Sequence, residues 1–446
     1  MEEQDRISDL PADILDKIMG LLWIGEAARC AILSTALRDA WYNLTELDFD
    51  ESFYDNIYSD CDEDPAIWHD IVNGYLNKHN GTIRKFVVYF RLQACKCEFS
   101  KLFRSVTKKG VQDLEIDLYR FDGMRYSLPS CIFKCPTLKI FSATGVQIDP
   151  IKAHFIFPNV TSLVFYGVRF CPRSPNLHAL EVPILQSLKF CGCKDISYFN
   201  INAPKLCSLS IIECFTSIAT GYENHYYDDY ENDFEKWVFK STYDESSYDS
   251  DDRDMFCYDP VKEKDMSDGG FLPMNLYLGS FCRLHLSFFD IWEIVDEFSR
   301  MRLPMPALDV QYLNLTGVFF TDSDWISKFV SFLQSCPKLC ELDICFQVKV
   351  HESSSGVYNL LYSHNMLKTL KFRLFSGSKS EVQFLTRLIA CFPTCKKVSI
   401  FCQRRFGSRK KANIREEILS SSRLSSTAKI YLKYNKDALG EISRYY

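Results

Sequence analysis

The sequence has none of the short motifs that usually mark an enzyme active site. It contains no G-x-x-x-x-G-K-[ST], no G-x-G-x-x-G, no H-E-x-x-H and no G-x-S-x-G, and its 8 histidines are scattered. Its 19 cysteines include no C-x-x-C matched by a second such pair or by a nearby H-x-x-x-H, which argues against structural zinc. We therefore expect a protein with no catalytic residues, no metal and no cofactor.

Long apolar runs are also absent. No stretch of about 18 uncharged apolar residues exists to span a bilayer, so we expect no membrane contact. The first ten residues, MEEQDRISDL, lack the basic and apolar regions of a secretory signal, which predicts a cytoplasmic or nuclear protein, or one found in both. In such a reducing compartment the cysteines are expected to be small buried apolar side chains and not disulfide partners.

The strongest positive signal is an internal repeat of the form apolar-x-x-apolar-x-apolar. Successive copies lie 21 to 29 residues apart, with a single gap of 75. Residues two apart point to the same face of a strand, and a unit this short buries its apolar face only by stacking on its neighbours. The copies begin at Ile83, Val111, Leu138, Val160, Leu185, Leu206, Phe281, Val310, Leu339, Leu367 and Cys395.

Helical patterns separate the later copies. DIWEIVDEF, DSDWISKFVSFL and EVQFLTRLIACF each place apolar residues on one stripe at helical spacing. Strand, turn and helix repeating at about 28 residues describe an α/β solenoid. Two of the earlier copies, LQSLKFCGC and LCSLSIIEC, match the consensus of leucine-rich repeats, including the cysteine after the third anchor.

The 75-residue gap coincides with an acidic segment, residues 221–270. This segment holds 16 Asp or Glu against 5 Lys or Arg and lacks aliphatic periodicity, so we expect a largely disordered surface insert. Ser246, Ser247 and Ser250 lie among its carboxylates and are candidate phosphorylation sites, where phosphate would add further negative charge. A basic stretch, QRRFGSRKK, is expected to be an exposed loop or an import signal, and a nucleic-acid partner is unlikely on this acidic chain.

The N-terminal residues predict a small group of amphipathic helices. Pro11 and Asp13 suit the first turn of a helix, and a second helical pattern runs over residues 26–41. A unit of about 40 residues usually needs outside support to be stable, which suggests an obligate partner. The apolar stripe of the first helix consists of Ile14, Leu15, Ile18, Leu21 and Leu22.

The stretch DRISDLPADILDKIMGLLWIGEAARCAILSTALRDAW resembles an F-box. Together with the repeats and the closing segment EEILSSSRLSSTAKIYL, it resembles the plant F-box/leucine-rich-repeat proteins that often end in an FBD region. The resemblance implies a small all-helical F-box followed by an irregular leucine-rich-repeat solenoid of alternating strands and helices. Two departures stand out, because family members commonly have Pro at the place of Trp23 and a basic pair with Trp in the stretch from Thr35 to Leu37.

This resemblance also implies a function. Members of the family are substrate-recognition subunits of SCF-type E3 ubiquitin ligases, in which the F-box binds a Skp-type adaptor, the adaptor joins a cullin, and the repeats hold the protein to be ubiquitinated. Such a subunit contributes proximity and no chemistry of its own. The alternative is a repeat scaffold or inhibitor with a degenerate F-box. Carried over by position, the adaptor-binding residues are Leu10, Pro11, Ile14, Leu15, Ile18, Leu21, Leu22, Leu33 and Trp41.

The expected organisation follows from these patterns. It comprises an F-box in residues 1–45, a connecting segment in 46–80, repeats in 81–220, the acidic insert in 221–270, repeats in 271–402, and a basic loop with an FBD-like tail in 403–446.

Overall fold

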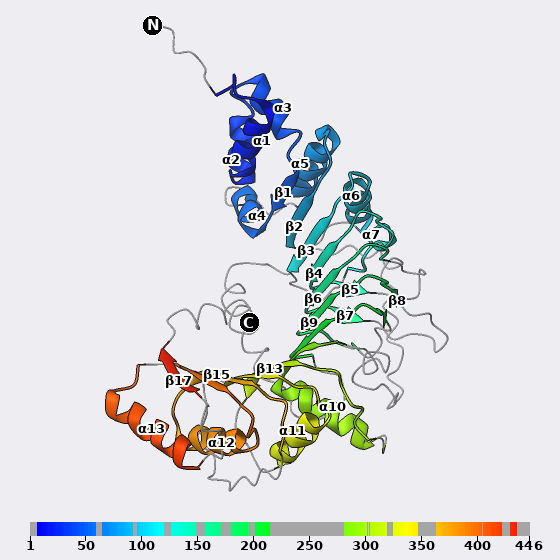
Figure 1. Cartoon of the computed structure of the whole chain (residues 1–446). Coiled ribbons are helices and arrows are strands. Elements are labelled where there is room, and N and C mark those ends of the chain that lie inside the picture. The colour runs from blue at the N-terminus through cyan, green and yellow to red at the C-terminus, as the bar shows by residue number, and fades with distance from the viewer. Residues whose placement is uncertain are drawn as a thin grey trace, which may run out of the picture. The chain divides into compact units, whose positions relative to one another are not determined.

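The structure is a computed structural model that contains both helices and strands (Figure 1); the predicted alternation of the two holds only in parts of the chain, because β4 to β12 follow one another without a described helix between them. The acidic insert at 221–270, with its three candidate phosphorylation serines, lies outside the residues that the structure describes. The described residues are 7–58, 65–91, 96–119, 126–148, 157–170, 180–194, 196, 201–214, 281–300, 302, 304–318, 324–346, 363–403, 405–421 and 429–434.

The described residues form a 13-stranded sheet whose strands are all paired in parallel with their neighbours. Its order follows the chain, because each strand pairs with the previous and the next main strand (Figure 1). The strands are β1 (Glu46–Phe49), β2 (Lys85–Arg91), β3 (Asp113–Tyr119), β4 (Ile140–Thr144), β6 (Ser162–Tyr166), β9 (Ser187–Cys191), β11 (Ser208–Ile212), β12 (Arg283–Ser287), β13 (Tyr312–Val318), β14 (Glu341–Phe346), β15 (Thr369–Phe375), β16 (Lys397–Cys402) and β17 (Lys429–Tyr434).

Parallel pairing requires crossovers between the strands, and helices and short strands lie in the described parts of these crossovers. The short strands pair as β5 (Gln147–Ile148) with β7 (Arg169–Phe170) and β8 (Leu180–Glu181) with β10 (Ile201–Asn202). The helices are α1 (Ala12–Gly20), α2 (Ile24–Cys30), α3 (Thr35–Trp41), α4 (Glu51–Tyr58), α5 (Pro65–Lys78), α6 (Lys96–Lys108), α7 (Ser130–Phe133), α10 (Phe288–Arg300), α11 (Asp324–Gln334), α12 (Lys379–Ala390) and α13 (Ser408–Ser421).

The predicted repeat frames are confirmed as sheet anchors. In each of the 11 frames the second and third anchors lie on a main strand, and the first anchor is buried just before it. The anchors lie in register, so that Leu188 pairs with Leu163 on one side and Leu209 on the other. Their side chains form one apolar layer, in which the rings of Phe165 and Phe190 stack with centroids 5.8 Å apart. The three predicted helices also form, as α10, α11 and α12.

The sheet extends beyond the predicted repeats by one strand at each end. Strand β1 pairs with β2 and presents Leu47 and Phe49 to the core, although it lies in the segment expected to be a connection. Strand β17 pairs with β16 over six positions, and its partly buried Ile430 and Leu432 pack against the core.

A recurrent turn or bulge in the backbone lies two residues after the third anchor, at the end of a strand or just before it. Gly145, Gly167, Gly192 and Gly317 adopt φ angles between 54° and 71° at this position, in the left-handed region where an L side chain is strained. Glu213 adopts 54° at the equivalent place, and Leu374 adopts 56°. The glycines in ATGVQI, FYGVRF, FCGCKD and NLTGVF are therefore part of the repeat and re-aim the chain at the same point each time.

The 75-residue gap leaves the sheet continuous, because β11 and β12 pair in parallel across it. Asp290, at the start of α10, joins the residues after β11 to the end of β12 by hydrogen bonds. Its buried carboxylate accepts hydrogen bonds from the backbone N–H of Glu213 at 3.2 Å, of Cys214 at 3.3 Å and of Ser287 at 2.9 Å, and from the Ser287 hydroxyl. Burial raises the pKa of Asp290 to about 7, while these hydrogen bonds act in the opposite direction. Strands β11 and β12 are thus held together by the contacts of Asp290 as well as by their own pairing.

Candidate functional site

Helix α1 carries two adjacent apolar stripes that have different environments. At 100° per residue, Leu15 and Met19 share one stripe, and Ile14 with Ile18 shares the next. Leu15 and Met19 are only 3% and 1% exposed. Ile14 and Ile18 are each 36% exposed. Because α3 packs against α1, the described chain covers the first stripe and leaves the second open.

Other large apolar side chains beside α1 are also exposed. Leu21 is 87% exposed at the end of α1, and Ile32 and Leu33 are 84% and 76% exposed in the turn between α2 and α3. These values exceed those of every other large apolar side chain in the described part of the chain. Single exposed apolar residues are ordinary, but several of them within one small group of helices make this region a candidate binding surface. The N-terminal apolar set is defined here as Ile7, Ile14, Ile18, Leu21, Leu22, Ile32 and Leu33.

Specific contacts fix the helices that present this set. The Ser34 hydroxyl caps α3 by accepting a hydrogen bond from Leu37 N at 3.2 Å, and it also accepts one from the Ser8 hydroxyl at 2.7 Å. At the other end of α3 the Trp41 ring lies 4.7 Å from the ring of Tyr75 in α5. The Tyr75 hydroxyl donates to Trp41 O at 2.7 Å, which ties the helices to the start of the sheet.

The structure divides the sequence-predicted adaptor-binding residues into two groups. Leu15 is buried and Leu10 and Trp41 are partly buried, so these three side chains pack inside the chain. Pro11 is exposed and immediately precedes α1, where its φ of −55° suits a helix entry. The remaining predicted residues, Ile14, Ile18, Leu21, Leu22 and Leu33, are exposed and belong to the N-terminal apolar set. The set also contains Ile7 and Ile32, which are not among the residues predicted from the sequence.

Trp23 and Leu37, where the chain departs from the usual F-box pattern, are accommodated inside it. Leu37 is 7% exposed and belongs to the core of the three helices. Trp23 is partly buried against Phe53, with ring centroids 6.1 Å apart, and its ring covers Gly25 so closely that a Cβ there would lie 2.2 Å from it. Its backbone φ of −58° and ψ of 143° are values that proline adopts. Trp23 therefore keeps the conformation of a proline position and adds an aromatic contact.

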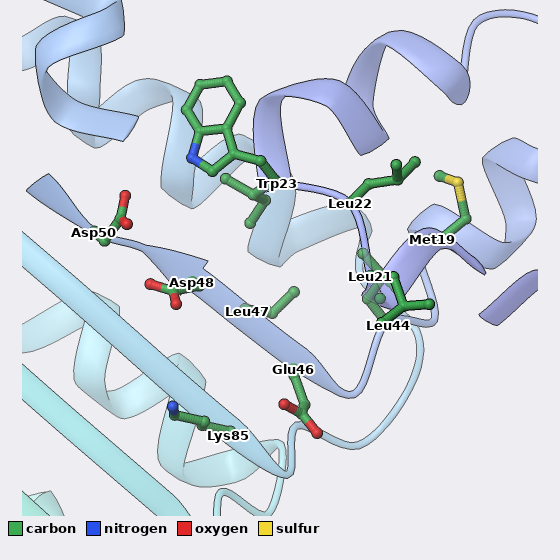
Figure 2. Close-up of a pocket in the computed structure, with 12 residues that line it drawn as sticks. Met19, Leu21, Leu22, Trp23, Leu44, Glu46, Leu47, Asp48, Asp50 and Lys85 are labelled. Atoms are coloured by element: carbon green, nitrogen blue, oxygen red, sulfur yellow. The ribbon is translucent and has the colours of Figure 1, made fainter. Parts of the chain in front are cut away.

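A cavity of about 270 Å³ lies between the end of α1 and strand β1 (Figure 2). One wall is apolar and the other is charged, with Glu46, Asp48 and Asp50 contributed by β1 and the residue after it, and Lys85 by β2 (Figure 2). Burial and the Asp50 carboxylate raise the pKa of Asp48, while Lys85 lowers it. The apolar wall consists of Met19, Leu21, Leu22, Trp23, Ile24, Leu44 and Leu47.

Other classes of site find no support in the described residues. Among them, no group of three or more His, Cys, Asp or Glu side chains is arranged to hold a metal ion. No helix within the described ranges is both long and apolar enough to cross a membrane. Several cysteines are core residues, as expected: burial raises the pKa of the Cys345 and Cys402 thiols to about 11, which keeps them protonated and unreactive at neutral pH.

The chain is similar to plant proteins whose names include F-box and leucine-rich repeats. Residues 99–222 match the family model described as the leucine-rich repeats of FBD-associated F-box protein At5g56370. Over 419 residues the chain is 22% identical to F-box/FBD/LRR-repeat protein At1g13570 of Arabidopsis thaliana, covering 90% of this chain and 91% of that protein. It is 22% identical to putative FBD-associated F-box protein At5g56560 over 91% of this chain and 94% of the relative, and 30% identical to putative F-box/LRR-repeat protein At3g58920 over 41% of each, both of Arabidopsis thaliana.

Proposed function

Since this chain is a relative of the plant F-box/FBD/LRR-repeat proteins, we propose that it is a substrate-recognition subunit of an SCF-type E3 ubiquitin ligase. In this proposal the N-terminal helices are an F-box that binds a Skp-type adaptor and, through it, a cullin. The sheet is a leucine-rich-repeat solenoid that holds a target protein for ubiquitination in the cytoplasm, the nucleus or both. The chain itself performs no chemistry and contributes proximity and orientation.

The observation that carries the proposal is the N-terminal apolar set. A helix that buries one apolar stripe inside the chain and exposes a second one beside it needs another protein to complete its core. Covering a leucine side chain fully contributes about 1.5 to 3 kcal/mol, so Leu21 and Leu33 together supply several kcal/mol of binding free energy. Leu15 and Trp41 act differently, because they hold α1 and α3 in place from inside the chain.

The proposed organisation keeps the predicted segments and adjusts one of them. The F-box occupies residues 1–45, the acidic insert interrupts the repeats at 221–270, and the FBD-like tail occupies 403–446. The segment 46–80 is then a first, helix-rich repeat as well as a connection, since β1 begins the sheet within it. The target binds the polar face of the sheet, where side chains between the apolar anchors are free to differ from repeat to repeat.

The test is a titration of the full chain with a purified Skp-type adaptor, by calorimetry, against the double variant Leu21→Asp, Leu33→Asp. Both side chains are mostly exposed, so the substitutions leave the fold intact and place two carboxylates in the contact. We expect binding by the wild type and at least about a hundredfold weaker binding by the variant, from the lost burial of two leucines.

Met366→Asp is the matched control. Met366 is 50% exposed but lies before β15, remote in sequence from the F-box helices, so its substitution is expected to leave adaptor binding unchanged. Failure of the wild type to bind any Skp-type adaptor would instead favour a repeat scaffold or inhibitor with a degenerate F-box.

A further inference from the structure

The cavity beside β1 has more carboxylates than cations among its lining residues. Glu46 forms an ion pair with Arg84, so its charge is already matched. Asp50 uses Oδ1 to accept a hydrogen bond from Phe53 N at 2.9 Å, which caps α4 and leaves Oδ2 for another donor. Asp48 makes no hydrogen bond or ion pair with any other described residue. The cavity therefore offers two carboxylates to an incoming donor, with Lys85 as the one cation among its lining residues.

The opposite wall suits an apolar stem. Met19 of α1, Ile24 of α2, and Leu44 and Leu47 at the start of the sheet are all less than 6% exposed and line the cavity. In Figure 2 Asp48 and Asp50 lie along β1, and Trp23, Leu22 and Met19 lie above that strand on the side of the helices. A guanidinium binds carboxylates through a planar fork of N–H donors and stacks on aromatic faces, while its three methylenes pack on apolar surface. Arginine combines all three properties.

We propose that this cavity binds an arginine side chain from an extended basic segment of a partner protein. The guanidinium lies between Asp48 and Asp50 against the face of Trp23, and the methylenes pack on the apolar wall. The site goes beyond the adaptor contact proposed above, because its charged wall belongs to the sheet edge and not to the F-box helices. The two surfaces share only Leu21 and Leu22, so a partner that covers the N-terminal apolar set also forms one rim of the cavity.

The proposal is tested without any adaptor. The probe is Nα-acetyl-arginine methylamide, and its neutral isostere Nα-acetyl-citrulline methylamide is the reference; binding of each to the full chain is followed by saturation-transfer NMR. We expect the arginine probe to bind, with an affinity that falls as salt is raised, and the citrulline probe to bind at least about tenfold more weakly. Equal binding of the two probes, or binding of neither, would overturn the proposal.

Variants locate the site. Asp48→Asn with Asp50→Asn removes both charges, while the amide oxygen of the second asparagine can still cap α4 at Phe53 N, and we expect arginine binding to weaken about tenfold or more. Glu416→Gln removes an exposed carboxylate from α13, which does not line the cavity, and is expected to change little. Lys85→Met removes the cation that competes for the carboxylates, so it should strengthen binding, a gain that a misfolded protein cannot show. Retained arginine binding in the double variant would place the site elsewhere and contradict the assignment.

This outcome is separable from that of the proposed function. Adaptor binding together with a failed arginine probe would remove the cavity proposal alone. Arginine binding by a chain that ignores every Skp-type adaptor would remove the ubiquitin-ligase proposal alone.

Discussion

Helix α1 and strand β9 are both rich in apolar residues but bury their side chains to very different extents. In β9 both anchors, Leu188 and Phe190, are 0% exposed, because the neighbouring strands present anchors in the same register. In α1 the apolar residues are divided between a buried stripe and an exposed one, since α3 covers only part of the helix. The same residue types thus mark a completed core in one place and an incomplete core in the other.

The difference teaches where a partner is needed. A strand inside the array has a copy of itself on each side, so stacking completes its apolar layer. The three N-terminal helices have no such copy, and their remaining apolar residues face outward. The comparison predicts that substitutions in the sheet change stability, whereas substitutions in the exposed stripe change binding.

The largest expected effect is the difference in stability between two leucine truncations, one in the sheet and one in the N-terminal apolar set. Leu188→Ala leaves a cavity inside the sheet and should lower the free energy of unfolding by about 2–5 kcal/mol. Leu21→Ala, at a side chain 87% exposed, should change it by less than about 0.5 kcal/mol. Urea unfolding followed by circular dichroism measures both. A loss of stability in Leu21→Ala similar to that in Leu188→Ala would mean that the N-terminal set is already buried by the chain and needs no partner.

The repeat pattern predicted most of the sheet because the pattern depends only on residues close together in the sequence. An apolar residue at every second position must face one side of a strand, and equal spacing brings such strands into register, as Leu163, Leu188 and Leu209 show. The gap of 75 residues did not disturb this prediction, because the strand pairing resumes in register after it. The weakest frame, Leu138-x-x-Phe141-x-Ala143, is completely buried like the others.

Other features depend on contacts that the sequence pattern does not report. Strand β1 has the repeat pattern in LTELDF, but its 39-residue distance from the next frame placed it outside the regular spacing. The division of α1 into a buried and an exposed stripe depends on where α3 packs, which one helical periodicity cannot specify. The cavity needs Asp48 and Lys85 together, and these residues meet only because β1 and β2 pair.

A second prediction concerns the polar face of the sheet, where the half-buried His285 has a shifted pKa. Burial and the nearby cations Arg373 and Lys189 lower the pKa of His285 to about 4. The folded chain then binds a proton less readily than the unfolded chain, whose histidine has a pKa near 6.5. The stability that His285 contributes to the fold is fully present above about pH 6.5. It is lost as the pH falls towards 4, by about 3 kcal/mol in total.

The variant His285→Asn isolates this effect. Asp290 and Asp117 have raised pKa values of about 7 and about 6, so they stabilise the fold as the pH falls and oppose the histidine. The difference in urea midpoint between wild type and His285→Asn, measured from pH 7.5 to 4.5, should therefore change in favour of the variant at low pH. A difference independent of pH would show that His285 is solvated and that this face of the sheet is as open as the exposed stripe of α1.

The smallest expected changes in stability come from two glycine substitutions, which test how closely the sheet is packed at its recurrent turns. Gly145 and Gly167 have similar positive φ angles, of 68° and 54°, but different surroundings. A Cβ on Gly145 would lie 2.3 Å from Leu118 O of the preceding repeat, whereas a Cβ on Gly167 would meet no atom within 4 Å. Gly167→Ala should therefore cost only the left-handed strain, about 1 to 2 kcal/mol. Gly145→Ala carries the same strain and also a backbone clash, so the urea concentration at which it unfolds should be the lower of the two. Equal midpoints would mean that the backbones of adjacent repeats can move apart without loss of stability.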